Sequence, residues 1–437
     1  MLKRIVLVPL VLWLLSVSGV AQAAPKIEHW TTSNGLRVYY VHAPELPMLD
    51  LRLQFDAGSA RDGAKPGLAM LTAQMLDTGA AGLSEDQLAE QFESVGAQFS
   101  ASASMDMTAI SLRTITLEKP QQTALDLWLK VITQPDFPQA AFERIQKLTL
   151  VALQGEKQDP ESLANKAFYQ ALYGDHPYGQ PANGTESSIP ALKAADLKAF
   201  YQQYYVAKNG LLAMVGAVER AQAEALAEKI AAALPAGAAA APIPEVKPLT
   251  EAKTVKIPYP SAQAHILIGQ IGNKRGDADF YTLYMGNQVL GGSGFASRLM
   301  KEVRTKRGLS YSVYSYFAPF AQLGVFELGL QTKLEQTDEA LKVARDTLQQ
   351  FQQEGATAEE LEAAKKDITG GFPLRTANNS QIVEYVGMIG FYQLPLDYLD
   401  TFTSKVNALS SEAITEAFKR RVQPDKMVTV IVGGDEK

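Results

Sequence analysis

The chain has 437 residues, which is too long for one compact core and favours two or more domains. Apolar residues make up 46% and charged residues 20%, a globular composition, and the formal net charge of -6 offers none of the basic surface that nucleic-acid binding requires. The absence of cysteine excludes disulfides, thiolate metal sites, a thiol nucleophile and a lipid-modified cysteine.

The first 23 residues have the pattern of a secretory signal peptide. Lys3 and Arg4 precede an apolar run, and Ala21, Gln22 and Ala23 form a small-residue cleavage site. A membrane anchor is the less favoured alternative because the apolar run is short. We expect cleavage near Ala23, which changes the formal charge from -6 to -8, and a periplasmic or secreted product with no membrane association afterwards.

Strands open the first half of the mature chain. Residues 36–42 and 49–58 alternate or run apolar over strand lengths. A helix is predicted over 84–96 because Ser84 supplies an N-cap in front of an amphipathic stretch. Residues 97–115 then alternate small and apolar side chains, as the two strands of a hairpin do.

An Ala-, Pro- and Gly-rich segment, residues 231–253, lies near the middle of the mature chain. Its prolines preclude a continuous helix, so we interpret it as an exposed linker between an N-terminal domain at 24–230 and a C-terminal domain at 254–437. Both domains end with an Ala-Phe helix end, a polar turn and an apolar strand that closes on Val-Gly. This similarity indicates two copies of one fold.

The second half also combines strands and helices. A strand is predicted at 265–272, and a helix at 337–355 has acidic residues early and Gly355 at its end. Strands and helices mixed without strict β-α-β alternation predict an α+β fold. We expect two homologous α/β sandwich domains, each an antiparallel sheet flanked by helices.

Several stretches resemble the M16 metallopeptidases, the pitrilysin-like or inverted-zincin group. They are GSARDGAKPGLAMLTAQMLDTGA at 58–80, then 95–114, then 173–189, and much of the second half. Their order and spacing match the family over nearly the whole mature chain. The resemblance implies the M16 fold and a peptidase-related function.

The zinc motif of that family is degenerate here. Active members carry H-x-x-E-H on the helix after Gly-Leu-Ala, two histidine ligands around a general-base glutamate. The two histidine positions read Met70 and Gln74, the base position reads Ala73, and the family's distal glutamate ligand falls at Ala152. Methionine and glutamine are poor Zn²⁺ ligands and alanine is none, so we expect this helix only to pack against a core.

No other cluster replaces the lost site in the sequence. The chain has no Gly-x-Ser-x-Gly nucleophile motif. The histidines are scattered, and none lies at ligand spacing from another: His29, His42, His176 and His265. We therefore expect no cofactor in this chain and no hydrolysis by this chain alone.

Residues 290–317, LGGSGFASRLMKEVRTKRGLSYSVYSYF, match the family best. Arg304 and Tyr311 have the family's spacing. The resemblance implies that this pair binds substrate backbone carbonyls near the scissile bond, and a fixed cation and a phenol donor suit that chemistry. The alternative is a solvated basic helix end followed by strand tyrosines. Gly-Gly-Ser-Gly lacks a following Gly-Lys-Ser/Thr, so it favours a tight turn over a phosphate loop.

In the family a complete chamber takes four such domains, in one chain or split between two subunits. The resemblance implies that this chain is the non-catalytic subunit of a periplasmic heterodimer, with Arg304 and Tyr311 acting in trans beside a zinc-carrying M16 paralogue. The substrate would be a peptide or unfolded polypeptide bound along a sheet edge.

Three alternatives stay open. The chain can be an inert M16-like scaffold or peptide-binding protein with no role in proteolysis. It can be an independent peptidase with an unrecognised metal site. The partner can also be a second copy of this chain rather than a paralogue.

Overall fold

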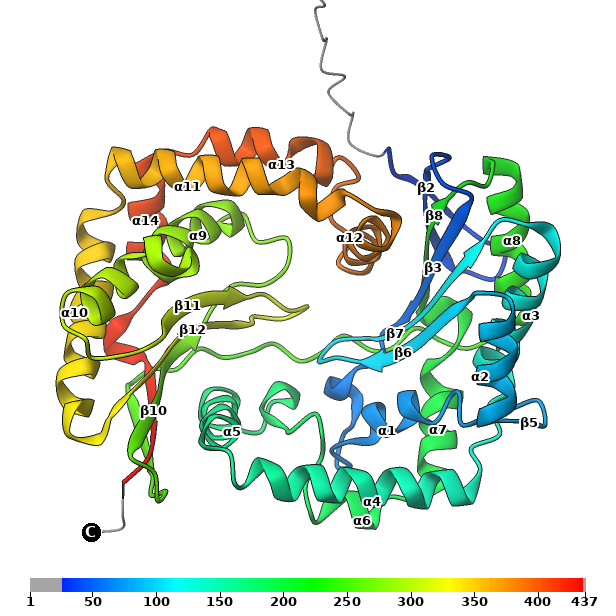
Figure 1. Cartoon of the computed structure of the whole chain (residues 1–437), viewed down its shortest axis with the longest axis horizontal. Coiled ribbons are helices and arrows are strands. Elements are labelled where there is room, and N and C mark those ends of the chain that lie inside the picture. The colour runs from blue at the N-terminus through cyan, green and yellow to red at the C-terminus, as the bar shows by residue number, and fades with distance from the viewer. Residues whose placement is uncertain (1–25, 435–437) are drawn as a thin grey trace, which may run out of the picture.

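The computed structural model describes residues 26–434, and the predicted signal peptide at 1–23 lies outside them. Two halves face each other, and each is a sheet flanked by helices (Figure 1). The strands are β1 (Glu28–Thr31), β2 (Arg37–His42), β3 (Met48–Phe55), β6 (Gln98–Ala103), β7 (Thr108–Ile115) and β8 (Gly210–Gly216) in the first sheet, and β9 (Lys253–Ile257), β10 (Gln263–Ile271), β11 (Val313–Ala318), β12 (Val325–Lys333) and β13 (Val428–Val432) in the second.

The helices surround these sheets. In the first half they are α1 (Leu68–Gln74), α2 (Glu85–Ser94), α3 (Glu118–Thr133), α4 (Gln139–Glu156), α5 (Pro160–Tyr173), α6 (Ser188–Ala191), α7 (Ala194–Tyr204) and α8 (Arg220–Ala233). In the second half they are α9 (Phe280–Asn287), α10 (Thr337–Glu354), α11 (Ala358–Gly371), α12 (Asn379–Phe391), α13 (Tyr398–Asn407) and α14 (Ser411–Arg421). A two-stranded ribbon, β4 (Gly79–Ala80) and β5 (Leu83–Ser84), precedes α2.

The two sheets share one topology, which confirms the predicted duplication. The first has the order β1-β2-β8-β3-β7-β6, and the second has β9-β13-β10-β12-β11, the same order without the outermost strand. In both, the last strand of the half inserts in the middle, parallel to the first of the shared strands and antiparallel to the next. Each sheet is therefore mixed, with one parallel pair, rather than purely antiparallel as expected.

Local sequence signals explain several element boundaries. The Ser84 hydroxyl accepts a hydrogen bond from the Gln87 backbone N–H, and the Gln87 side chain accepts one from the Ser84 N–H, a complete capping box at the start of α2. Helix α10 begins with Asp338 and Glu339 in its first turn and is followed by Gly355 at φ 73°. The hairpin predicted at 97–115 is β6 and β7. These predictions are confirmed.

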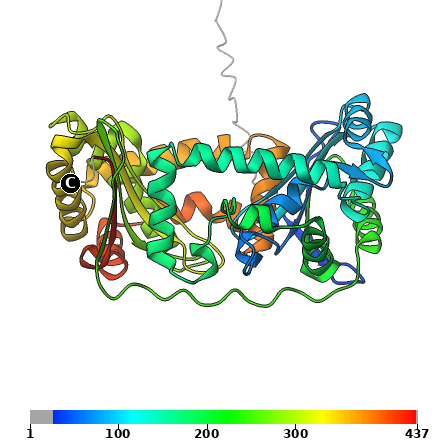
Figure 2. The same ribbon diagram turned by 90° about the horizontal axis from the view of Figure 1, so that it is seen from below.

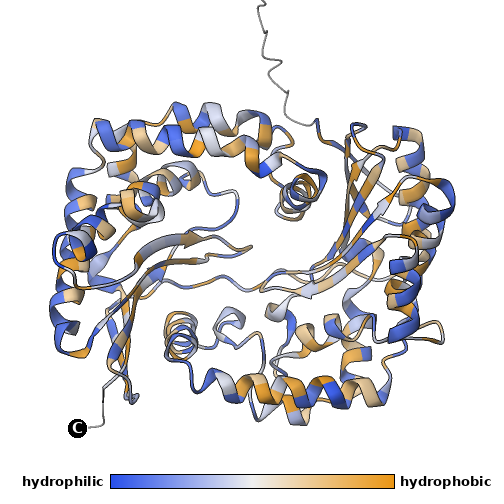
Figure 3. Ribbon diagram, in the orientation of Figure 1, coloured by the Kyte–Doolittle hydropathy of each residue, from blue (hydrophilic) through white to orange (hydrophobic). Residues whose placement is uncertain are grey.

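One helix of each half packs against the sheet of the other half. Helix α12 packs on β8 and β3 of the first sheet, and α5 packs on β13 and β10 of the second. Glycines permit the close approach: a Cβ at Gly390 would lie 2.4 Å from Leu211 Cδ1, and one at Gly269 would lie 2.7 Å from Phe168 Cζ. The strands of both sheets are mostly hydrophobic, and the helices carry hydrophilic residues on their outer turns (Figure 3). The two halves thus share their hydrophobic cores.

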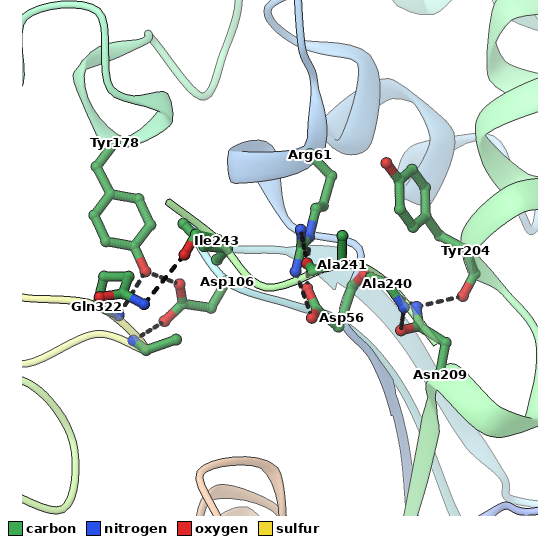
Figure 4. Close-up of polar contacts among 11 residues, drawn as sticks. Asp56, Arg61, Asp106, Tyr178, Tyr204, Asn209, Ala240, Ala241, Ile243 and Gln322 are labelled. Atoms are coloured by element: carbon green, nitrogen blue, oxygen red, sulfur yellow. Dashed lines mark hydrogen bonds and ion pairs between the residues drawn. The ribbon is translucent and has the colours of Figure 1, made fainter. Parts of the chain in front are cut away.

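The segment between α8 and β9 is extended and runs across the molecule from one half to the other (Figure 2). Side chains of both halves hold its backbone (Figure 4). Arg61 Nη1 donates to the Ala241 carbonyl at 2.6 Å, and Gln322 Nε2 donates to the Ile243 carbonyl at 3.1 Å. Ile243 and Val246 are buried in a core cluster. The expected linker is therefore an extended segment that is exposed along most of its length and is held in place by both halves.

A buried carboxylate joins the halves near this segment. Asp106, between β6 and β7, accepts hydrogen bonds from the Tyr178 hydroxyl at 2.5 Å, the Ala321 N–H at 2.8 Å and the Tyr392 hydroxyl at 2.9 Å. Ala321 and Tyr392 belong to the second half, and Figure 4 shows Asp106 beside Tyr178. Burial raises the pKa of Asp106, and the hydrogen bonds from Tyr178, Ala321 and Tyr392 oppose that rise.

Over residues 26–434, no helix has the length and apolar character of a membrane span.

Candidate functional site

Helix α1, which carries the degenerate zinc motif, is positioned by a buried acid. The Asp62 carboxylate accepts hydrogen bonds from the Gly67 N–H at 2.7 Å and the Ala69 N–H at 2.8 Å, so it satisfies two free donors of the first turn. Burial raises the pKa of Asp62 to about 7, against the effect of these backbone hydrogen bonds. Gly67 adopts φ 95°, a left-handed conformation that lets the chain turn into the helix.

The structure brings three of the four degenerate positions together. Met70 and Gln74 on α1 and Ala152 on α4 line one pocket of about 530 Å³. Ala73 is fully buried and is absent from the pocket lining. The distal ligand position predicted at Ala152 thus lies on the helix that faces α1. A zinc site at these positions would need two imidazoles and a carboxylate. The pocket instead offers a thioether, an amide and a methyl group.

The other groups that line this pocket do not compensate for the lost ligands. Glu85 forms an ion pair with Arg144, and Glu156 accepts a hydrogen bond from Asn183 Nδ2 at 3.0 Å. Burial raises the pKa of Asp77, so this carboxyl is less readily ionised than an exposed one. Over residues 26–434, no three His, Cys, Asp or Glu side chains lie close enough together to hold a metal ion. The residues present therefore do not fit zinc.

The four histidines lie on different elements and contact their local surroundings. His29 Nδ1 lies 2.8 Å from the Val38 carbonyl, and His42 Nε2 lies 3.8 Å from Glu219. His176 Nδ1 accepts a hydrogen bond from the Tyr178 N–H at 3.1 Å and caps a short 3-10 turn, Pro177–Gly179. His265 lies against the Gln331 side chain, with 3.0 Å between His265 Nδ1 and Gln331 Nε2.

The second half presents Arg304 and Tyr311 together. The Arg304 guanidinium carbon lies 4.6 Å from the centroid of the Tyr311 ring, within cation–π range. Tyr311 is 79% exposed and Arg304 is half-buried. Arg304 is the second-last residue of a π-helical turn, Met300–Thr305, a rare geometry that is frequent at functional sites.

The guanidinium of Arg304 is free to bind. The nearby carboxylate of Glu302 is taken by two other cations, Lys306 at 2.6 Å and Arg307 at 2.8 Å. Within residues 26–434, Arg304 forms no ion pair and its side chain forms no hydrogen bond. Its donors can therefore bind a carbonyl or carboxylate without breaking an internal contact.

Buried contacts hold the backbone of this segment from behind. Asn287 Nδ2 donates to the Ser315 carbonyl at 2.9 Å, and the Ser315 hydroxyl donates to Asn287 Oδ1 at 2.7 Å. A Cβ at Gly291 would lie 2.3 Å from Ser315 Oγ, so this glycine permits the turn to pack on β11. Arg298 forms a bidentate ion pair with Glu360 at 2.9 and 2.6 Å. Internal packing thus explains why glycine occurs in the Gly-Gly-Ser-Gly turn.

Sequence reasoning missed Phe295, which completes the surroundings of Arg304. Its ring centroid lies 4.7 Å from the Arg304 guanidinium carbon, and its side chain is 70% exposed. A large aromatic residue inside a glycine-rich polar turn is the signal that could have identified it. Helix α9, which leads into this segment, lies in the half opposite α1 and α4 (Figure 1).

Comparisons with known proteins agree with this architecture. Residues 37–186 match the family model of insulinase, peptidase family M16, and residues 191–368 match that of the peptidase M16 inactive domain. A crystal structure described as a peptidase M16 inactive domain from Pseudomonas fluorescens is 40% identical, with a TM-score of 0.91, over 94% of this chain and 99% of that chain.

Two further relatives are informative. A Helicobacter pylori protein named non-peptidase homolog YmxG is 28% identical over 407 residues, 92% of each chain. The periplasmic protease PqqL of Escherichia coli shares the fold, with a TM-score of 0.79 and 18% identity over 94% of this chain and 46% of that chain. The present chain therefore belongs to the peptidase M16 family, as a member without the family's zinc ligands.

Proposed function

We propose that this chain is the non-catalytic, substrate-binding subunit of an M16-type zinc peptidase heterodimer. Arg304 and Tyr311 would act in trans, beside the zinc of a paralogous partner. The observation that carries the proposal is the contrast between a pocket without metal ligands at Met70, Gln74 and Ala152 and a half-buried Arg304 whose guanidinium is unpaired beside the exposed Tyr311.

The chemistry of the pair suits a peptidase. Hydrolysis of a peptide bond passes through a tetrahedral oxyanion, which donors fixed in advance stabilise. The Arg304 guanidinium and the Tyr311 hydroxyl offer such donors, and the contacts behind the segment keep the backbone in place. Arg304 and the degenerate pocket lie in opposite halves, so the pair is proposed to serve a site outside its own half.

The size of the chain supports a two-subunit chamber. The chain corresponds in fold to slightly less than half of the periplasmic protease PqqL. A two-domain chain would thus supply one half of an enclosed chamber, and a partner would supply the other. We propose export to the periplasm from the signal pattern in residues 1–23.

A sheet edge can take the substrate. Strand β6 lies at one edge of the first sheet, and helix α1 packs against this strand. Its last four residues, Ser-Ala-Ser-Ala, are small and leave room for an extended chain to add as a further strand. Peptides and unfolded segments are the expected substrates because strand addition needs a free main chain.

The test is turnover by the reconstituted pair. The chain is co-expressed with an M16 paralogue that carries H-x-x-E-H, and cleavage of an unfolded polypeptide is followed. Arg304→Ala and Tyr311→Phe are each expected to lower kcat by about 10²-fold or more, the loss seen when an oxyanion donor is removed. Lys301→Ala, an exposed cation three residues before Arg304, is the matched control and should retain turnover. Unchanged turnover in both variants would refute the role.

An inert scaffold remains the alternative function, favoured by the name of the Helicobacter relative, a non-peptidase homolog. A zinc-carrying partner with full activity when this chain is absent would establish it. A pair that elutes together in size-exclusion chromatography, while this chain alone elutes as a monomer, supports the heterodimer against a homodimer.

A further inference from the structure

The Arg304 guanidinium lies between two aromatic rings. Tyr311 approaches it at 4.6 Å and Phe295 at 4.7 Å, both measured from the guanidinium carbon to the ring centroid. Phe295 belongs to a short 3-10 turn, Gly294–Ala296, whose first residue has φ 55°. Phe295 and Arg304 come from two separate short helical turns, and Tyr311 comes from the bend just before β11.

The exposure of these rings is the unusual feature. Phe295 is 70% and Tyr311 79% exposed, although a phenylalanine is most often found inside a protein. Arg298, another arginine of this segment, shows what a structural role produces: its bidentate ion pair with Glu360 is largely buried, and it also donates to the Gly355 carbonyl at 2.7 Å. Arg304 has none of these contacts, so Phe295 stacks on a cation whose donors remain open.

We propose that Phe295 is a specificity-determining and positioning residue: it holds the Arg304 guanidinium against Tyr311 and prefers ligands with an aromatic or large apolar side chain next to the bound carbonyl. The identity of the ligand as a peptide rests on the function proposed above. The guanidinium donates in its own plane, so a carbonyl approaches along the edge left open between the two rings. The exposed Phe295 ring then forms an apolar wall beside the α-carbon that carries the neighbouring side chain.

The physical reasons for this preference are both local. A peptide side chain that covers Phe295 removes apolar surface of both partners from water, and aromatic pairs gain further from ring geometry. Stacking also limits the rotamers of Arg304 before a ligand arrives, which lowers the entropy lost on binding. A peptide with glycine at that position has no side chain to cover Phe295, so it would gain only from the restricted rotamers of Arg304.

The experiment uses the full mature chain and matched peptides. A capped peptide of alternating glycine and serine with one central phenylalanine is compared with peptides that carry leucine, glycine or glutamate there. Binding is followed by NMR through the side-chain Nε–Hε signal of Arg304, which also reports ring stacking without any peptide. We expect the wild-type chain to bind the phenylalanine peptide about fivefold more tightly than the glycine peptide.

Phe295→Ala should bring that ratio close to one and move the Arg304 signal toward that of an unstacked arginine. Phe295→Tyr should keep both the ratio and the signal, and Arg304→Ala should weaken binding of every peptide by a similar factor. Phe295 is exposed, so these variants should unfold at the wild-type temperature. A wild-type chain without selectivity, or a ratio that survives Phe295→Ala, overturns the proposal.

The outcomes also separate this inference from the proposed function. If Arg304→Ala abolishes turnover of the reconstituted pair but Phe295→Ala leaves peptide selectivity intact, the function stands and the inference fails. If selectivity depends on Phe295 but Arg304→Ala leaves turnover unchanged, the chain has a selective peptide site that takes no part in catalysis.

Discussion

Helix α1 follows strand β3 in the first copy of the fold. The segment from Leu290 to Tyr311 follows the equivalent strand, β10, in the second copy. The polar groups of these two regions differ in whether they have partners within the chain. Around α1, carboxylates accept backbone or side-chain hydrogen bonds, and the former ligand positions carry groups that bind no zinc. In the second segment, Arg304 keeps a free guanidinium between two exposed rings. An internal ion pair would suit stability equally well, and the open donors are the basis of the binding role that we propose for Arg304.

Under the proposed function, the two halves have lost chemistry independently. A zinc site needs several ligands at fixed distances, so losing its donors removes the site while the helix still packs. A carbonyl-binding pair needs only two side chains and a fixed backbone. The pocket at α1 is therefore a structural remnant, and the Arg304 segment is where we place the function.

The largest expected effect comes from returning ligands to the first half. Met70→His, Gln74→His and Ala152→Glu combined should produce zinc binding about 10³-fold tighter than in the unmodified chain, because the three positions line one pocket. Calorimetric zinc titration measures the gain. The same three changes with Ala152→Gln supply a control with one ligand fewer. Zinc binding no tighter than in this control would show that α1 and α4 lie too far apart for a metal site.

A smaller effect is expected at a buried acid beside the second segment. Glu327 on β12 is 1% exposed, and burial raises its pKa from 4.5 to about 7 despite hydrogen bonds from Tyr316 and Tyr314. A raised acid pKa means that the folded state holds its proton longer than the unfolded state. This group's contribution to stability is therefore present at low pH and is lost as pH rises between 4.5 and about 7.

Glu327→Gln should remove that pH dependence and raise the free energy of unfolding by about 1–3 kcal/mol above neutral pH, with little change at acidic pH. Urea unfolding across this pH range measures it. Glu335→Gln, at an exposed position just after β12, is the matched control. A parallel loss of stability with pH in the wild type and Glu327→Gln would contradict the assignment.

The smallest effect should be on the stability of the Arg304 variants. Arg304→Ala should change the free energy of unfolding by about 1 kcal/mol or less, since cation–π contacts to exposed rings contribute little. Arg298→Ala should cost about 1–3 kcal/mol, because it removes the bidentate ion pair with Glu360 and the donor to the Gly355 carbonyl. Thermal unfolding of both variants compares a binding arginine with a structural one. Equal losses would mean that Arg304 is structural too.

Much of the fold was predictable because its signals are local. The Ser84 capping box, the Gly355 helix end and the β6–β7 hairpin depend on a few adjacent residues. The exchange of α5 and α12 was not predictable, because amphipathic helices show an apolar face without showing which sheet it will cover. The insertion of β8 and β13 beside a parallel neighbour likewise depends on contacts distant in sequence.

The candidate sites divide in the same way. Met70, Ala73 and Gln74 occupy one helix, so the loss of zinc chemistry could be read from residue types alone. The stacking of Phe295 on Arg304 could not, because their distance is set by a π-helical turn and by glycine packing on β11. The sequence by itself determined the family, the duplication and which donor atoms exist. Only the tertiary structure decided which of those donors remain unpaired, because pairing depends on distances between side chains that the order of residues does not contain.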